Sequence, residues 1–194
     1  MEFPGGNCTA NIPLMKVNHY QVQPGLFAGE YPGNRSPQVA ETRLRELLER
    51  GIVTFIDLTT RADADLGLLP YEPHLAELEI AVPGEIRRRS FEIPDMGIPS
   101  SPDVMRGVLD LIRTEISAGR TCYIHCWGGI GRTGTVVACW LKESGMSAEN
   151  ALVRVQSLYE SHMDERKRAR YPRSPQQSVQ LQYVREWPGP KMPG

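Results

Sequence analysis

The feature that most constrains the fold is a short segment, residues 121–141, in which a glycine-rich loop joins an apolar strand to an apolar helix. Residues 121–124 form a run of strand length, and residues 135–141 are apolar almost all round, which is typical of a buried helix. The loop between them contains a cysteine and an arginine. A buried helix that follows a strand through such a turn indicates an α/β fold.

The rest of the chain favours the same fold class, because strands and helices alternate before the helices gather near the C-terminus. Ser36-Pro37 and Ser101-Pro102 are typical helix starts, with a capping side chain followed by proline at the first helical position. Helices are expected at residues 37–50, 71–78, 102–118, 135–141, 148–159 and 175–187. Strands are expected at residues 26–28, 52–56, 87–93 and 121–124. The pattern predicts a central, mostly parallel, twisted sheet flanked by helices.

The length of 194 residues is most simply that of one domain with a substantial core. Residues 1–22 are rich in proline, glycine and asparagine, and we expect them to form an extended arm. We therefore expect a single domain at residues 23–187, followed by a flexible tail at residues 188–194.

Charge and cysteine usage narrow the class of protein. The formal net charge of −1 gives no overall preference for nucleic acid or for an anionic membrane. No stretch has the apolar length of a membrane span or the pattern of a signal peptide. The four cysteines, which lack the spacing of a disulfide framework or a zinc site, are Cys8, Cys122, Cys126 and Cys139. We expect a cytoplasmic monomer that binds neither nucleic acid nor membrane.

The loop from Cys126 to Arg132 has the composition of an anion site. Its glycines, Gly128, Gly129 and Gly131, would let backbone N–H groups converge on one point without obstruction by Cβ atoms. Arg132 offers a planar, permanently charged group that can bind two oxygens of a phosphate. The same positive field, with the positive end of the following helix, favours the thiolate form of the cysteine. One loop could thus activate a nucleophile and bind its substrate.

The run His125-Cys126-(five residues)-Arg132-Thr133-Gly134 resembles the signature of the protein tyrosine phosphatase superfamily. It is most similar to the dual-specificity branch, and within it to the cyclin-dependent-kinase-associated phosphatases. The resemblance implies a cysteinyl-phosphate mechanism with Cys126 as nucleophile and Arg132 as phosphate clamp. It implies that His125 orients the loop and that Thr133 stabilises the sulfur as it leaves phosphorus. The residues expected to surround the phosphate are Trp127, Gly128, Gly129, Ile130, Gly131 and Arg132.

The resemblance also implies a general acid and a residue that positions water. Asp95, in the Pro-Asp-x-Gly loop 31 positions before Cys126, fits the acid that protonates the leaving oxygen. Gln176 and Gln180 fall in a segment similar to the glutamine-bearing loop of many members, and either is a candidate for positioning water. The implied substrate is a phosphorylated protein, and neither a metal nor a cofactor is implied.

Other interpretations remain open on sequence grounds. Gly129-x-Gly131-x-x-Gly134 also fits a dinucleotide-binding fingerprint, although a helix rather than a strand is expected next. Cys126 could be an inert core cysteine, and Cys122 and Cys139 are expected to be packing residues. The basic run at residues 164–173 could be a solvated face or a docking site for an acidic substrate. Alternative functions are a phosphoinositide or small phosphate-monoester phosphatase, a non-catalytic phosphate-binding module, and a sulfur-transfer or arsenate-type enzyme.

Overall fold

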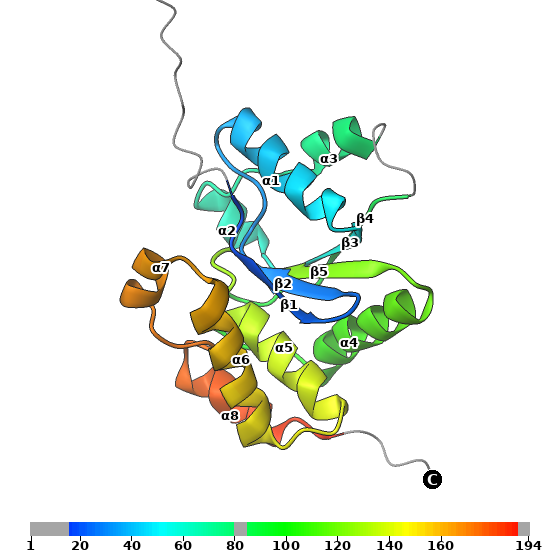
Figure 1. Cartoon of the computed structure of the whole chain (residues 1–194). Helices are drawn as coiled ribbons and strands as arrows, with labels where there is room; N and C mark the ends of the chain where they lie inside the picture. Colours follow the sequence, from blue (N-terminus) through cyan, green and yellow to red (C-terminus); the bar gives the residue numbers. More distant parts are fainter. Residues whose placement is uncertain (1–15, 80–84, 190–194) are drawn as a thin grey trace, which may run out of the picture.

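A single five-stranded sheet with the strand order β1-β2-β5-β3-β4 organises the chain (Figure 1). The computed structural model describes residues 16–79 and 85–189, so Cys8 lies outside the described residues. The strands are β1 (His19–Gln23), β2 (Leu26–Gly29), β3 (Ile52–Asp57), β4 (Arg87–Ser90) and β5 (Thr121–His125). Strands β2, β5, β3 and β4 are parallel, whereas β1 pairs with β2 in antiparallel fashion. The predicted fold class is confirmed.

Helices cover both faces of the sheet. Their bounds are α1 (Pro37–Glu49), α2 (Arg61–Asp65), α3 (Glu72–Glu79), α4 (Pro102–Ser117), α5 (Gly131–Glu143), α6 (Ala148–His162), α7 (Glu165–Arg170) and α8 (Ser178–Glu186). Figure 1 shows α1 and α3 above the sheet, and α4, α5, α6 and α8 below it. Helix α5 lies in the middle of the lower layer and is buried at every position from 131 to 142, as predicted.

The helix boundaries follow the local signals of the sequence. Proline occupies the first helical position after Ser36 and after Ser101, although neither serine side chain caps its helix by a hydrogen bond. Ser147 does cap α6, because its hydroxyl accepts a hydrogen bond from the backbone N–H of Asn150. Gly51, with φ of 77°, ends the α1 segment in the left-handed region that glycine adopts readily.

Three elements were not predicted. Strand β1 lies in the segment assigned to the N-terminal arm, and it forms because pairing with β2 buries Tyr20 and Val22. Helices α2 and α7 are only five and six residues long, too short for a periodic pattern to show. Strand β4 ends at Ser90 rather than at residue 93, and α8 begins at Ser178 rather than at residue 175.

The sheet separates two hydrophobic cores. The larger core lies between the sheet and the lower helices and includes Ile112, Val137 and Val155. The smaller core lies between the sheet and α1 and α3 and includes Leu44 and Phe55. The exact placement of β5 between β2 and β3 brings the loop that follows it to the centre of the sheet edge.

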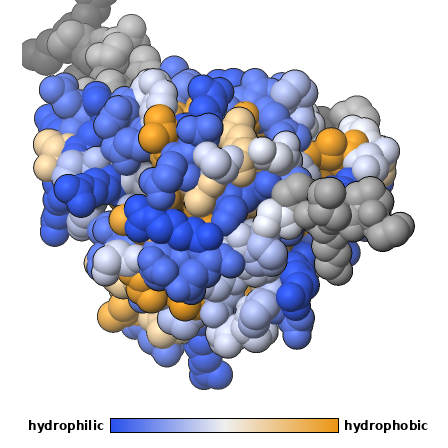
Figure 2. All heavy atoms as spheres, turned by 90° about the horizontal axis from the view of Figure 1, so that it is seen from below, coloured by the Kyte–Doolittle hydropathy of each residue, from blue (hydrophilic) through white to orange (hydrophobic). Residues whose placement is uncertain are grey.

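The outer face of the lower helices is mainly hydrophilic. Figure 2 shows this face from below, with apolar residues in small, scattered groups. The exposed apolar side chains on α6 and α8 are isolated ones, Val153 and Val179. Among the described residues, no helix has both the length and the apolar character needed to cross a bilayer.

Candidate active site

The Cys126 loop, residues 126–130, connects the carboxyl end of β5 to the first turn of α5. Its neighbours on both sides are the chain segments that leave β2 and β3 at the same edge. The backbone N–H of Tyr31 donates to the carbonyl of Trp127 at 3.0 Å, and that of Leu58 donates to His125 at 2.9 Å. The loop is therefore fixed by the sheet, at the edge where open α/β sheets commonly bind ligands.

Steric crowding requires glycine at two positions of the segment from Cys126 to Arg132. Gly129 has a φ of +72°, and a Cβ atom there would lie 2.4 Å from the backbone of Gly29. A Cβ atom at Gly131 would lie 2.9 Å from the side-chain amide of Gln180. Gly128 differs, because a Cβ atom there would make only ordinary contacts at 3.6 Å. A Cβ atom at Gly128 would thus meet no close neighbour among the described residues.

Cys126 lies deep in a cavity of about 640 Å³ and is only 3% exposed. The hydroxyl of Thr133, on the first turn of α5, donates a hydrogen bond to the sulfur at 3.1 Å. Cys122 and Cys139 lie in the larger core and do not line the cavity, and burial raises the pKa of Cys122 to about 12. Of the three described cysteines, Cys126 is therefore the one that a molecule in the cavity can contact.

Arg132 is 2% exposed and is surrounded by acceptors. Its two terminal nitrogens donate to the carboxylate of Asp63 at 2.8 and 2.9 Å, and one of them also donates to the carbonyl of Ile93 at 3.2 Å. The carboxylate of Asp95 also lies 2.8 Å from one of these terminal nitrogens. Burial by itself would lower the pKa of Arg132, but the hydrogen bonds to Asp63 and the nearby sulfur of Cys126 outweigh it and raise the pKa.

Asp63 is the functional candidate that sequence reasoning missed. It lies on α2 and is 2% exposed, and its carboxylate also accepts hydrogen bonds from the N–H and hydroxyl of Thr60 at 2.7 and 2.9 Å. Burial would raise the pKa of Asp63, but the bonds from Arg132 and Thr60 reverse this and lower it. The one available signal was Thr60-x-x-Asp63, which has the form of a capping box at a helix start.

Asp95 lies on the Asp95 loop, residues 94–99, and its side chain is 59% exposed at the edge of the cavity. The loop is tightly turned, since the N–H of Gly97 donates to the carbonyl of Pro94 at 3.0 Å. Met96 adopts a φ of 59°, which is uncommon for a residue other than glycine. The structure thus brings Asp95, Cys126 and Arg132, three candidates from the sequence, to one cavity.

The two candidate glutamines differ in what their side chains do. Gln180 is buried, and its amide oxygen accepts hydrogen bonds from the backbone N–H groups of Gln176 and Gln177, both at 3.1 Å. Its amide nitrogen donates to the carbonyl of Gly97 at 2.9 Å, which ties α8 to the Asp95 loop. Gln176 is half-buried and lines the cavity, and no hydrogen bond of its side chain is recorded among the described residues. Gln176 is therefore the glutamine with a free amide facing the cavity.

His125 is fully buried behind the Cys126 loop. Its Nε2 atom lies 2.8 Å from the hydroxyl of Tyr71, and its Nδ1 atom lies 3.8 Å from the carboxylate of Asp57. Burial lowers the pKa of His125, although Asp57 partly opposes this, so the imidazole is neutral at pH 7. Asp57 also binds Arg88 at 2.7 Å and Thr59 at 2.7 Å. A neutral, enclosed ring can orient the loop without taking up a second proton.

The basic run at residues 164–173 is mostly exposed, but Lys167 turns inward. Its ammonium group donates to the carbonyl of Gly128 at 3.0 Å and also binds the carboxylate of Glu30. Arg43 lies 3.6 Å from the same carboxylate. The run is thus a solvated face with one lysine that contacts the Cys126 loop, a role that sequence reasoning did not foresee.

The entrance of the cavity combines apolar surface and positive charge. Trp127 is 39% exposed, Leu69 is 49% exposed and Met96 is 47% exposed, and all three line the opening. Arg35 also lines it, and no ion pair of Arg35 with another described residue is recorded. An entrance of this kind suits a ring or chain that carries an anionic group at its end.

Comparison with known proteins found a matching family model and several similar proteins. A family model described as polymorphic toxin system, DSP-PTPase phosphatase, matches residues 30–146. A putative tyrosine phosphatase of Invertebrate iridescent virus 3 is 28% identical over 150 residues, covering 75% of this chain and 52% of the viral protein. The chain spans about half the length of the curated relatives it matches.

Two solved structures share the fold. Kinase associated phosphatase, solved with its catalytic cysteine replaced by serine, superposes with a TM-score of 0.65 at 22% identity and covers 88% of this chain and 92% of its own. PTPMT1, solved in complex with PI(5)P, superposes with a TM-score of 0.59 at 15% identity, covering 88% and 94%.

Proposed function

Because this chain belongs to the polymorphic toxin system DSP-PTPase phosphatase family, we propose that it hydrolyses phosphotyrosine in proteins through a cysteinyl-phosphate intermediate. The observation that carries the proposal is the meeting of Cys126, Arg132 and Asp95 in one cavity at the carboxyl edge of the sheet. Residues 23–187 act as one phosphatase domain in this proposal.

In the first step the sulfur of Cys126 attacks phosphorus, so that the S–P bond forms as the P–O bond to the substrate breaks. Arg132 and the backbone N–H groups of residues 127–131 bind the equatorial oxygens, whose charge they neutralise. Asp95, in its acid form, gives its proton to the leaving oxygen. For this, the carboxyl group turns from Arg132 toward the substrate, which the 59% exposure of its side chain permits.

In the second step water attacks phosphorus and the S–P bond breaks. Asp95, now a carboxylate, takes a proton from this water, and inorganic phosphate leaves. The hydroxyl of Thr133, 3.1 Å from the sulfur, stabilises the departing thiolate. Gln176, with its free amide at the cavity, positions the water, whereas Gln180 holds the Asp95 loop against α8.

The depth of the cavity supports an aryl substrate. Cys126 is nearly inaccessible at 3% exposure, and Trp127, Leu69 and Met96 form an apolar opening above it. A phenyl ring reaches further into such an opening than a serine side chain, and it buries apolar area as it does so. We therefore expect phosphotyrosyl peptides to have a higher kcat/KM than phosphoseryl peptides.

The test compares hydrolysis of an aryl phosphate by the wild-type chain with that by Cys126→Ser, Arg132→Ala and Asp95→Asn. Turnover should be lost in the first two variants. Asp95→Asn should slow turnover by about 10²–10⁴-fold, the usual contribution of general acid catalysis. Exposed Asp103→Asn, on α4, is the matched control and should retain wild-type turnover. Normal turnover by Cys126→Ser would refute the cysteinyl-phosphate mechanism, and binding without turnover by the wild type would establish a non-catalytic module.

A phosphoinositide is the second candidate substrate. Lys167, Arg43 and Arg35 line the cavity beside the Cys126 loop, and they could contact further phosphates of an inositol ring. The shared fold with PTPMT1, which binds PI(5)P, supports this candidate. Two of these cations are already paired with Glu30, which favours the protein substrate. A panel of phosphotyrosyl peptide, phosphoseryl peptide and PI(5)P, compared by kcat/KM, separates the candidates.

A further inference from the structure

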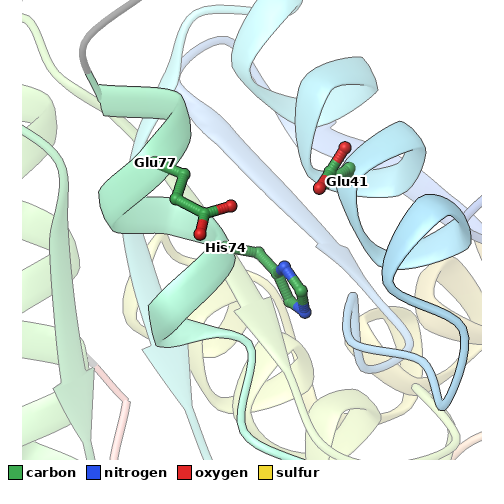
Figure 3. Close-up of side chains that lie close together, drawn as sticks. All are labelled: Glu41, His74 and Glu77. Atoms are coloured by element: carbon green, nitrogen blue, oxygen red, sulfur yellow. The ribbon is translucent and has the colours of Figure 1, made fainter.

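Three metal-ligating side chains meet at the contact between α1 and α3. Glu41 lies on α1, and His74 and Glu77 lie one turn apart on α3 (Figure 3). The nearest donor atoms of the three side chains all lie within 4.8 Å of one another. Figure 3 shows the two carboxylates and the imidazole pointing into the space between the helices.

These donors are not engaged elsewhere. Among the described residues, the side chains of Glu41, His74 and Glu77 have no hydrogen-bond or ion-pair partner. Two carboxylates that face each other without a cation repel, because the Coulomb energy of like charges at this separation is unfavourable. A divalent cation between them would remove this repulsion and use the imidazole as a third ligand.

We propose that Glu41, His74 and Glu77 form a binding site for a divalent transition-metal ion, with Zn²⁺ as its best-fitting occupant. An imidazole with two carboxylates suits Zn²⁺, which takes nitrogen and oxygen ligands at about 2.0–2.2 Å. Mg²⁺ and Ca²⁺ prefer oxygen ligands alone. The flexible glutamate side chains contract around the ion, and water completes the coordination. The site is half-exposed, so an ion can enter directly from solvent.

The bound ion joins two helices that already pack together. Leu44 of α1 and Leu75 of α3 belong to the same hydrophobic core beneath the site. The ion therefore stabilises the upper helix layer, on the opposite face of the sheet from α5 (Figure 1). None of the three ligands lines the cavity at Cys126, so the site is distinct from the candidate active site.

The experiment measures zinc binding by the full chain carrying Cys126→Ser, a substitution that removes the sulfur at the cavity as a competing ligand. After dialysis against a chelator, calorimetric titration with ZnCl₂ should give one high-affinity ion per chain. Zinc at 100 times its Kd should raise Tm by about 5–10 °C. MgCl₂ and CaCl₂ should produce no comparable rise. The zinc site does not include the cavity at Cys126, and zinc binding is measured without turnover. Failure of zinc binding therefore leaves the phosphatase proposal unaffected.

Variants locate the ion. His74→Ala and Glu41→Gln should each weaken zinc binding by at least about tenfold, since even the partners of ligands contribute that much. Without metal, His74→Ala should keep the Tm of the parent, because surface substitutions usually change stability little. Glu41→Gln should match or slightly exceed that Tm, because it removes the repulsion between the two carboxylates. His162→Ala and Glu49→Gln, an imidazole and an α1 carboxylate outside the site, should bind zinc like the parent. No zinc binding by the parent, or unchanged affinity in His74→Ala, would overturn the proposal.

Discussion

The guanidinium of Arg132 is oriented by Asp63, a carboxylate on a short helix far from it in sequence. Both side chains are almost fully buried, and they share two hydrogen bonds of 2.8 and 2.9 Å. In a buried pair the loss of one partner leaves an uncompensated charge, which is costly. The position of the Arg132 guanidinium, the proposed phosphate clamp, therefore depends on Asp63 as much as on the segment that contains Arg132.

We predict that Asp63→Asn lowers kcat/KM for an aryl phosphate by roughly 10²-fold, because the guanidinium loses its charged partner and its fixed orientation. Affinity for vanadate should fall with it, measured as the inhibition constant. Asp65→Asn is the matched control, since Asp65 lies on the same helix but is exposed. Equal activity of the two variants would show that Asp63 does not position Arg132.

At the scale of elements, short segments between the main helices hold the cavity together. Helix α7 brings Lys167 to the Cys126 loop, and Gln180 of α8 connects to the Asp95 loop through Gly97. The ammonium group of Lys167 holds the carbonyl of Gly128 in place by this hydrogen bond. Each contact is a single polar bridge between segments distant in sequence.

The substitution Lys167→Met should reduce kcat/KM by about tenfold or more, since a hydrogen bond to a charged group contributes about 1.5–3 kcal/mol. Lys167→Arg should recover part of the activity because it keeps the charge. Arg166→Met, an exposed neighbour on α7, should behave like the wild type. Steady-state kinetics over a range of aryl phosphate concentrations measures all three, and a wild-type value for Lys167→Met would contradict this role.

Another bridge between elements makes stability depend on pH. Glu115 of α4 accepts hydrogen bonds from Arg120 at 2.6 and 2.7 Å and from Thr54 of β3 at 2.5 Å. The bonds from Arg120, opposed by burial, lower the pKa of Glu115 to about 2, against an ordinary 4.5. Because the folded-state pKa is depressed, the stabilisation is complete above pH 4.5 and is lost as pH falls toward 2.

We therefore expect Glu115→Gln to be less stable than the wild type by about 1–3 kcal/mol at pH 7. This difference in the free energy of unfolding should shrink as pH falls from 4.5 toward 2. Urea unfolding at a series of pH values measures it. Asp110→Asn, which removes an exposed ion pair with Arg113, should show no such window. A difference that stays constant across this range would contradict the assigned pKa.

At the scale of the whole molecule, the candidate active site and the core of the upper helices lie in different parts of the structure. The cavity lies at the carboxyl edge of the parallel strands, next to α5, while α1 and α3 form a second core on the other face. Tyr31 belongs to that upper core and also lines the cavity. Substitutions of upper-core residues that lie away from the cavity should change the free energy of unfolding far more than the rate of turnover.

Leu44→Ala tests this separation, since Leu44 is fully buried in the upper core. The substitution should cost about 2–5 kcal/mol by removing apolar contacts and leaving a cavity. Activity well below the new Tm should stay within a few-fold of wild type. Val153→Ala, at an exposed position of α6, should leave both quantities unchanged. Chemical unfolding and steady-state kinetics on the same samples decide, and full loss of activity in folded Leu44→Ala would contradict the separation.

Local signals in the sequence determined the fold class, most helix starts and the loop from Cys126 to Arg132. Proline and glycine boundaries, strand-length apolar runs and the cysteine-to-arginine spacing each act over a few residues, so they can be read along the chain. The tertiary structure alone decided that Asp63 holds Arg132, 69 positions away, and that Lys167 contacts Gly128, 39 positions away. It also decided that β1 joins the sheet and that the side-chain amide of Gln180 is engaged in hydrogen bonds to the backbone. Such contacts depend on which segments the packed core brings together, and separated residues that meet only in space leave no periodic or local trace in one sequence.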